Sequence, residues 1–101
     1  MAYDIEALRT KHGRVEEIET VAGKLAFRKP TRAEWRKFKI AIAGDASDLA
    51  SADDNLMLDT VVSHTRDELS AMLDDEPGLA STPGMTPMLK RLAGAAAEGK
   101  G

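Results

Sequence analysis

The sequence has no cysteine, only four aromatic residues and no long apolar run in its 101 positions. Without cysteine, the chain can form neither a disulfide nor a cysteine-ligated metal site, and it has no thiolate nucleophile. No apolar stretch is long enough to cross a membrane, and Asp4 and Glu6 stand where a signal peptide would be apolar. We therefore expect a cytoplasmic protein that is neither secreted nor inserted into a membrane.

The residue patterns of catalytic and metal sites are also missing. His12 and His64 belong to no H-E-x-x-H or related zinc pattern, and the chain has no P-loop, no G-x-S-x-G elbow and no G-x-G-x-x-G. The acidic pair Asp53 and Asp54 would diverge along a helix, and no glycine-containing calcium loop surrounds it. We expect no catalytic residue, no cofactor and no metal.

Charge is unevenly distributed along the chain, although its net value is only −3. Residues 1–43 carry ten Lys and Arg against six Asp and Glu, whereas residues 44–76 carry one Arg against ten acids. This asymmetry indicates either ion pairing within the chain or complementary surfaces on a partner or on neighbouring copies. It argues against broad nucleic-acid binding, because nearby acids cancel the basic charge that phosphates require.

Apolar periodicity and turn residues predict one small α+β domain. A short N-terminal helix and a β-hairpin are expected to pack with about four short α-helices. The domain is expected to span residues 1–93, with a flexible C-terminal tail at 94–101. The expected strands are 15–21 and 25–28, around a turn at 22–24. The expected helices run from about Ile5 to Gly13, from Arg32 to Ala43, from Ala52 to His64, from Arg66 to Asp75, and from a Thr86 cap to Ala96.

The segment LAFRKPTRAEWRKFK, residues 25–39, is the most informative part of the chain. Pro30 disfavours helix at the residue before it, and Thr31 with Glu34 forms a capping box that starts a helix at Arg32. The apolar side of this helix is formed by Trp35, Phe38, Ala41 and Ile42, with Trp35 expected to be buried against the hairpin.

Other residues have no clear place in a core and are candidates for contact with a partner. Arg32, Arg36 and Lys39 share one side of the helix, and Ile40 lies among them, so another protomer or a client could cover it. Three acids end a later helix, where the helix dipole opposes them. Solvation alone is the alternative for every charged candidate. The full set is Arg28, Lys29, Arg32, Arg36, Lys39, Ile40, Asp74, Asp75 and Glu76.

The order of residues in this segment resembles that of the tail assembly chaperones of long-tailed bacteriophages and prophages. Those small proteins carry an aromatic residue, basic residues, Pro, Ser or Thr, Arg, Glu and an aromatic residue ahead of a basic helix. The matching residues are Phe27, Arg28, Lys29, Pro30, Thr31, Arg32, Glu34 and Trp35. The segments LRTKHGRVEEIE (8–19) and LDTVVSHTRDELSAMLDDEPGLAST (58–82) resemble the family's opening and its later helices.

The resemblance implies a non-enzymatic protein of the host bacterial cytoplasm. It would bind the tape measure protein, keep it soluble and help recruit tail tube subunits, and it would not remain in the mature virion. Self-association stays open, as do two other functions: a small structural tail or head-tail connector protein, and a nucleic-acid-binding regulatory domain. Four methionines could offer an adaptable client surface or fill the core: Met57, Met72, Met85 and Met88.

Overall fold

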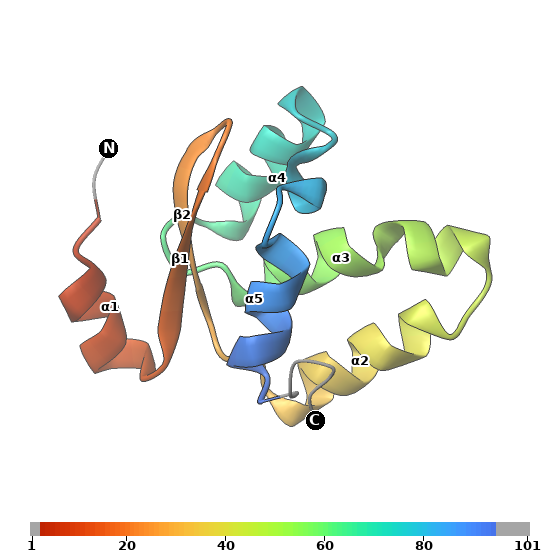
Figure 1. The fold of residues 1–101 in the computed structure, drawn as a ribbon, viewed down its shortest axis with the longest axis horizontal. Coiled ribbons are helices and arrows are strands. Elements are labelled where there is room, and N and C mark those ends of the chain that lie inside the picture. The colour runs from red at the N-terminus through yellow and green to blue at the C-terminus, as the bar shows by residue number, and fades with distance from the viewer. Residues whose placement is uncertain (1–2, 95–101) are drawn as a thin grey trace.

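The computed structural model describes residues 3–94, except for the side chains of residues 46–50. Figure 1 shows a two-stranded hairpin with the first helix on its left and the remaining helices on its right. This is the small, mainly helical α+β domain that the sequence predicts. In chain order the elements are α1 (Ile5–His12), β1 (Val15–Thr20), β2 (Gly23–Arg28), α2 (Arg32–Ile42), α3 (Ala46–Thr60), α4 (Arg66–Asp75), the 3-10 helix η1 (Leu79–Ser81) and α5 (Met85–Leu92).

The hairpin forms as predicted, but its turn is tighter than expected: β1 ends at Thr20 instead of Val21, and β2 begins at Gly23 instead of Leu25. Val15 lies opposite Arg28, and Thr20 lies opposite Gly23. Gly23 has a φ of 106°, which favours glycine, and the Thr20 hydroxyl donates a hydrogen bond to the Gly23 carbonyl. The turn therefore closes around Val21 and Ala22, one residue earlier than predicted.

Strand β2 runs through the middle of the molecule. Its residues Leu25, Ala26 and Phe27 are fully buried. Neighbouring strand residues point to opposite faces, so both faces of β2 are covered. Past α3 the chain returns along the free edge of β2, where Val62 donates its backbone N–H to the Ala26 carbonyl and the Ser63 hydroxyl accepts from the Ala26 N–H, at 2.9 Å each. These bonds satisfy polar groups that would otherwise be left unpaired.

The core forms where helices α3, α4, η1 and α5 meet β2. Helix α5 contributes Met85, Met88, Leu89 and Leu92, whose spacing puts them on one side of the helix. The expectation of a methionine-rich client surface is not supported by this packing. Met57, Met85 and Met88 are buried, and Met72 packs against the core, so these side chains fill space inside the domain.

Two helices begin where their capping residues predict. Thr31 with Glu34 and Thr65 with Glu68 each form both hydrogen bonds of a capping box, and α2 and α4 begin directly after these threonines. Helix α1 ends at His12, next to Gly13, as predicted.

Four predicted helix boundaries are wrong. Helix α3 begins at Ala46 instead of Ala52, and it ends at Thr60 because the following residues pair with β2. Helix α5 begins at Met85 after Gly84, whose φ of 89° provides the left-handed entry, so Thr86 is not its cap. It ends at Leu92, before the predicted Ala96. Apart from Gly94, the predicted tail lies outside the described residues.

Candidate partner-binding surface

Helices α2 and α3 lie side by side and run antiparallel, extending to the right in Figure 1. Phe38 of α2 is 6% exposed and belongs to the core, and Ala41 packs against it. The opposite side of α2 faces solvent. The pair of helices therefore carries one covered side and one open side, both set by the sequence spacing of α2.

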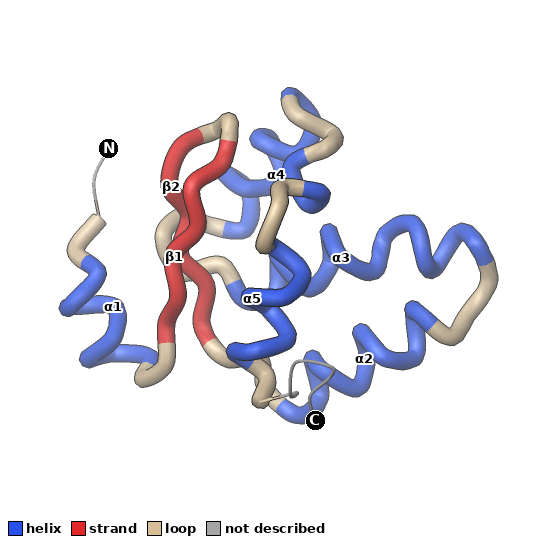
Figure 2. Tube along the Cα trace, in the orientation of Figure 1, coloured by secondary structure: helices blue, strands red, loops and turns tan. Residues whose placement is uncertain are grey.

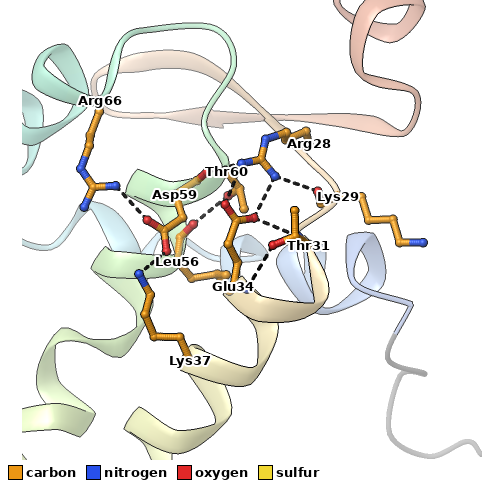
Figure 3. Close-up of polar contacts among 9 residues, drawn as sticks. All are labelled: Arg28, Lys29, Thr31, Glu34, Lys37, Leu56, Asp59, Thr60 and Arg66. Carbon is orange, nitrogen blue, oxygen red and sulfur yellow. Dashed lines mark hydrogen bonds and ion pairs between the residues drawn. The ribbon is translucent and has the colours of Figure 1, made fainter.

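A polar cluster holds the start of α2 in place (Figure 3). The Arg28 guanidinium, at the end of β2, donates two hydrogen bonds to the Glu34 carboxylate, at 2.9 and 2.8 Å. It also donates to the Asp59 carbonyl at 2.6 Å. One arginine thus joins β2, α2 and α3, and its bidentate pairing is the strong form of a charge-assisted hydrogen bond.

The Asp59 side chain is the acidic centre of the same cluster. It is only 8% exposed, and its carboxylate oxygens lie 2.8 Å from Lys37 Nζ and 2.8 Å from an Arg66 guanidinium nitrogen. The Lys37 contact is a close ion pair that falls outside the geometry of a directed hydrogen bond. Part of the charge asymmetry of the chain is therefore internal pairing, because Lys37 belongs to the basic part and Asp59 to the acidic part.

The cluster lowers the pKa of both carboxyl groups. The Arg28 hydrogen bonds lower the pKa of Glu34, against the opposing effect of burial. Burial alone would raise the pKa of Asp59, but contacts with Lys37 and Arg66 outweigh it and the net direction is downward. Both groups are charged at neutral pH, so the cluster is a closed set of ion pairs rather than an acid-base site.

We expect the cluster to make the domain sensitive to acid. The pKa values of Glu34 and Asp59 are lower in the folded chain than in the unfolded chain, so their stabilisation is present above the ordinary carboxyl pKa of about 4. It is lost as pH falls through the lower folded-state values. Denaturant melts of the wild type and of Asp59→Asn, measured between about pH 7 and 2, should show a smaller loss in the variant. Parallel losses in the two proteins would mean that Asp59 does not contribute.

The outer side of α2 carries cations with no such partner. Arg32, Arg36 and Lys39 are exposed, and none of them forms an ion pair within the part of the chain that the structure describes. Ile40 lies among them and is 66% exposed. We call these four residues the α2 basic face. The sequence spacing predicted this arrangement, and the structure confirms that the four residues share one exposed side.

Two predictions for the apolar side of α2 need correction. Trp35 is half-buried rather than enclosed, although its ring stacks on Phe38 at a centroid distance of 5.0 Å and packs against the core. Ile42 is 44% exposed, because the end of α2 extends beyond the core.

The remaining candidate residues lie apart from the α2 basic face. Arg28 is engaged inside the polar cluster, and Lys29 is exposed. Asp74, Asp75 and Glu76 are exposed at the end of α4, at the top of Figure 1, whereas α2 is at the lower right. The structure thus separates the basic and acidic candidates into two surfaces.

A groove of about 570 Å³, which the sequence does not predict, lies beside the hairpin turn. The turn forms one wall, and the connection from α4 through η1 to α5, traced in Figure 2, forms the other. Val21, Leu79 and Pro83 supply apolar lining, and Glu19 and Glu76 also line it. Val21 is a sequence signal for this groove. Its apolar side chain suggests a place in the strand, but the residue lies at the turn and is 80% exposed.

Comparison with known proteins places the chain among proteins whose role is not established. A family model described as "Domain of unknown function (DUF6848)" matches residues 8–99. A solved structure titled "Structure of uncharacterised protein rbstp2171 from bacillus stearothermophilus" is similar, with a TM-score of 0.70 and 25% sequence identity over 93% of this chain and 95% of that chain. No curated protein matches.

The described residues offer neither a membrane-spanning helix nor a cluster of metal ligands. Between residues 3 and 94, no helix is long and apolar enough to cross a membrane. Among the side chains that the structure describes, no group of three or more acidic or histidine residues could hold a metal ion.

Proposed function

The chain belongs to the DUF6848 family, and we propose that it acts as a tail assembly chaperone of a bacteriophage or prophage. In this role it binds the tape measure protein, keeps it soluble and helps recruit tail tube subunits, without catalysing a reaction. It acts in the host bacterial cytoplasm and is absent from the mature virion. The sequence resemblance over residues 25–39 supports the role, and the α2 basic face is the observation that carries the proposal.

The chemistry of this face fits a long helical client. Such a client exposes apolar stripes flanked by charge, and Ile40 offers one apolar anchor among Arg32, Arg36 and Lys39. Burying one isoleucine contributes only about 1.5 to 3 kcal/mol, which is too little for a stable complex. Binding therefore requires the surrounding cations and several copies along one client, which is how a small protein covers a long chain.

The position of the face is fixed before a client arrives. Arg28 and the Thr31 capping box hold the first turn of α2, and Phe38 anchors its inner side. A preorganised helix loses little conformational entropy on binding, so more of the contact energy appears as affinity.

Co-expression with the tape measure protein of the same phage tests the proposal. We expect the wild type to keep that protein soluble and to co-purify with it in excess. Reversing Arg32, Arg36 and Lys39 to Glu should reduce the co-purified amount by about tenfold or more while leaving the domain folded, because exposed charges add little to stability. Reversal of three exposed lysines elsewhere, Lys11, Lys24 and Lys90, is the matched control and should behave as the wild type.

The outcomes separate the function from the choice of face. If the tape measure protein is equally soluble with the wild type and without any chaperone, the chaperone proposal fails. If the α2 reversal behaves as the wild type, the function stands and another face binds the client. Retention of the chain in purified virions would instead favour a structural tail or connector protein, and salt-sensitive binding to DNA or RNA would favour a regulatory domain.

A further inference from the structure

We infer that the groove beside the hairpin turn is the docking site for the α2 basic face of a second copy of this chain. The inference does not depend on the chaperone role, since it concerns the isolated protein. It rests on charge and apolar complementarity between two surfaces that a single copy cannot bring together.

The groove has an apolar lining, and acidic residues border it. Val21, Leu79 and Pro83 line it together with Glu19 and Glu76. The side chains of Glu19 and Glu76 have no hydrogen-bond or ion-pair partner among the side chains that the structure describes. Lys24 stands opposite Glu19 in the strand register but forms no ion pair with it in the described part of the chain. Two acidic residues and no basic residue are among those that line the groove, so acidic groups border its apolar surface.

The acidic end of α4 extends this charge. Asp74 and Asp75 are exposed and directly precede Glu76, and no cation pairs with either of them within the described residues. Like charges gathered at one place raise the local potential, and an opposite surface relieves it. This surface would repel an acidic partner and attract a basic one.

The α2 basic face has the complementary chemistry. Its three cations form no ion pair with any residue that the structure describes, and Ile40 lies beside them. Ile40 is 66% exposed and would find apolar contacts in the groove against Val21, Leu79 and Pro83. The cations would lie against the carboxylates of the groove and of the α4 end. An apolar contact flanked by complementary charges is common in specific protein interfaces.

The two surfaces lie in different parts of the molecule. The hairpin turn and the end of α4 are at the top of Figure 1, and α2 is at the lower right. The contact therefore forms between copies. We expect it to be head to tail, with each copy offering its groove to one neighbour and α2 to the next. Such a heterologous contact can repeat, and it gives a ring or an open row rather than a closed two-fold dimer.

A client that binds α2 would compete with this contact. Without a client, the groove of each copy covers Ile40 of its neighbour. A client of higher affinity would displace that neighbour.

Sedimentation velocity of the purified chain at low salt tests self-association over about 5 to 500 µM. We expect the mean mass to rise with concentration beyond that of a dimer and to fall as salt is added. Ile40→Asp removes the apolar anchor. The double substitution Glu19→Lys with Glu76→Lys reverses the charge of the two acidic residues that border the groove. Each should weaken association by about tenfold or more. Thermal melts confirm that each variant is folded, as expected for changes at exposed residues.

An equimolar mixture of these two variants distinguishes a contact between the groove and α2 from a contact between like surfaces. Ile40→Asp keeps an intact groove, and the groove variant keeps an intact α2, so the mixture should form a heterodimer that cannot grow further. A wild type that stays monomeric at every concentration overturns the inference. So does a groove variant that associates as well as the wild type, which would indicate a symmetric α2-to-α2 dimer, and so does a mixture in which no heterodimer forms.

Discussion

Replacing Phe27 by Ala should lower the free energy of unfolding by about 3 to 5 kcal/mol. The Phe27 side chain is fully buried in the core, and its backbone bridges to Val61 beyond α3. In a chain of this size the core is modest, so neighbouring side chains cannot close over the cavity that the missing ring leaves. Equilibrium unfolding in urea, followed by circular dichroism, measures the loss directly.

A matched control lies at the turn of the same hairpin. Val21 is 80% exposed, so Val21→Ala should change the free energy of unfolding by less than about 0.5 kcal/mol. If Phe27→Ala leaves too little folded protein to measure, Phe27→Leu provides a graded version with a loss of about 1 kcal/mol. A Phe27→Ala loss below about 1 kcal/mol would contradict the packing of β2 at the centre of the domain.

Replacing Arg28 by Ala should cost about 2 to 3 kcal/mol of folding free energy. The change leaves the Glu34 carboxylate and the Asp59 carbonyl without their donor. Removing one partner of a fully buried ion pair costs more, but the Arg28 and Glu34 side chains are 25% and 22% exposed, so water compensates in part. Denaturant melts at neutral pH provide the measurement.

The adjacent residue is the natural control for Arg28. Lys29 is exposed, and its side chain forms no hydrogen bond or ion pair with any residue that the structure describes, so Lys29→Ala should be close to neutral. Equal losses for the two variants would remove the structural role assigned to Arg28. A stable Arg28→Ala variant that no longer holds a client would return Arg28 to the partner-binding surface.

The contrast between Arg28 and Lys29 shows where sequence reasoning stops. Both residues were candidates for partner binding because neighbouring basic residues look alike in a sequence. Their fates differ because the Arg28 guanidinium meets Asp59, which is 31 positions away in the chain. No periodicity encodes a contact at that separation, and only the docking of α3 against β2 creates it.

The candidate binding surface divides along the same line. The α2 basic face was predictable because its four residues share one helix, and helical spacing alone puts them on one side. The groove was not predictable, because its walls come from the hairpin turn and from the connection that follows α4. Likewise, the burial of Met57 and Met88 depends on which helices surround them, and the exposure of Ile42 depends on how far α2 extends beyond the core.

By itself, the sequence determined the features that arise from residues a few positions apart. These are the two capping boxes, the hairpin and the apolar side of α5. The lack of cysteine by itself excludes a disulfide. Tertiary structure alone decided the end of α3, where pairing with β2 ends the helix at Thr60, and the partners of Arg28. The physical reason is that caps and turns are satisfied by local hydrogen bonds, whereas these features depend on backbone and side-chain partners that become neighbours only when the chain folds.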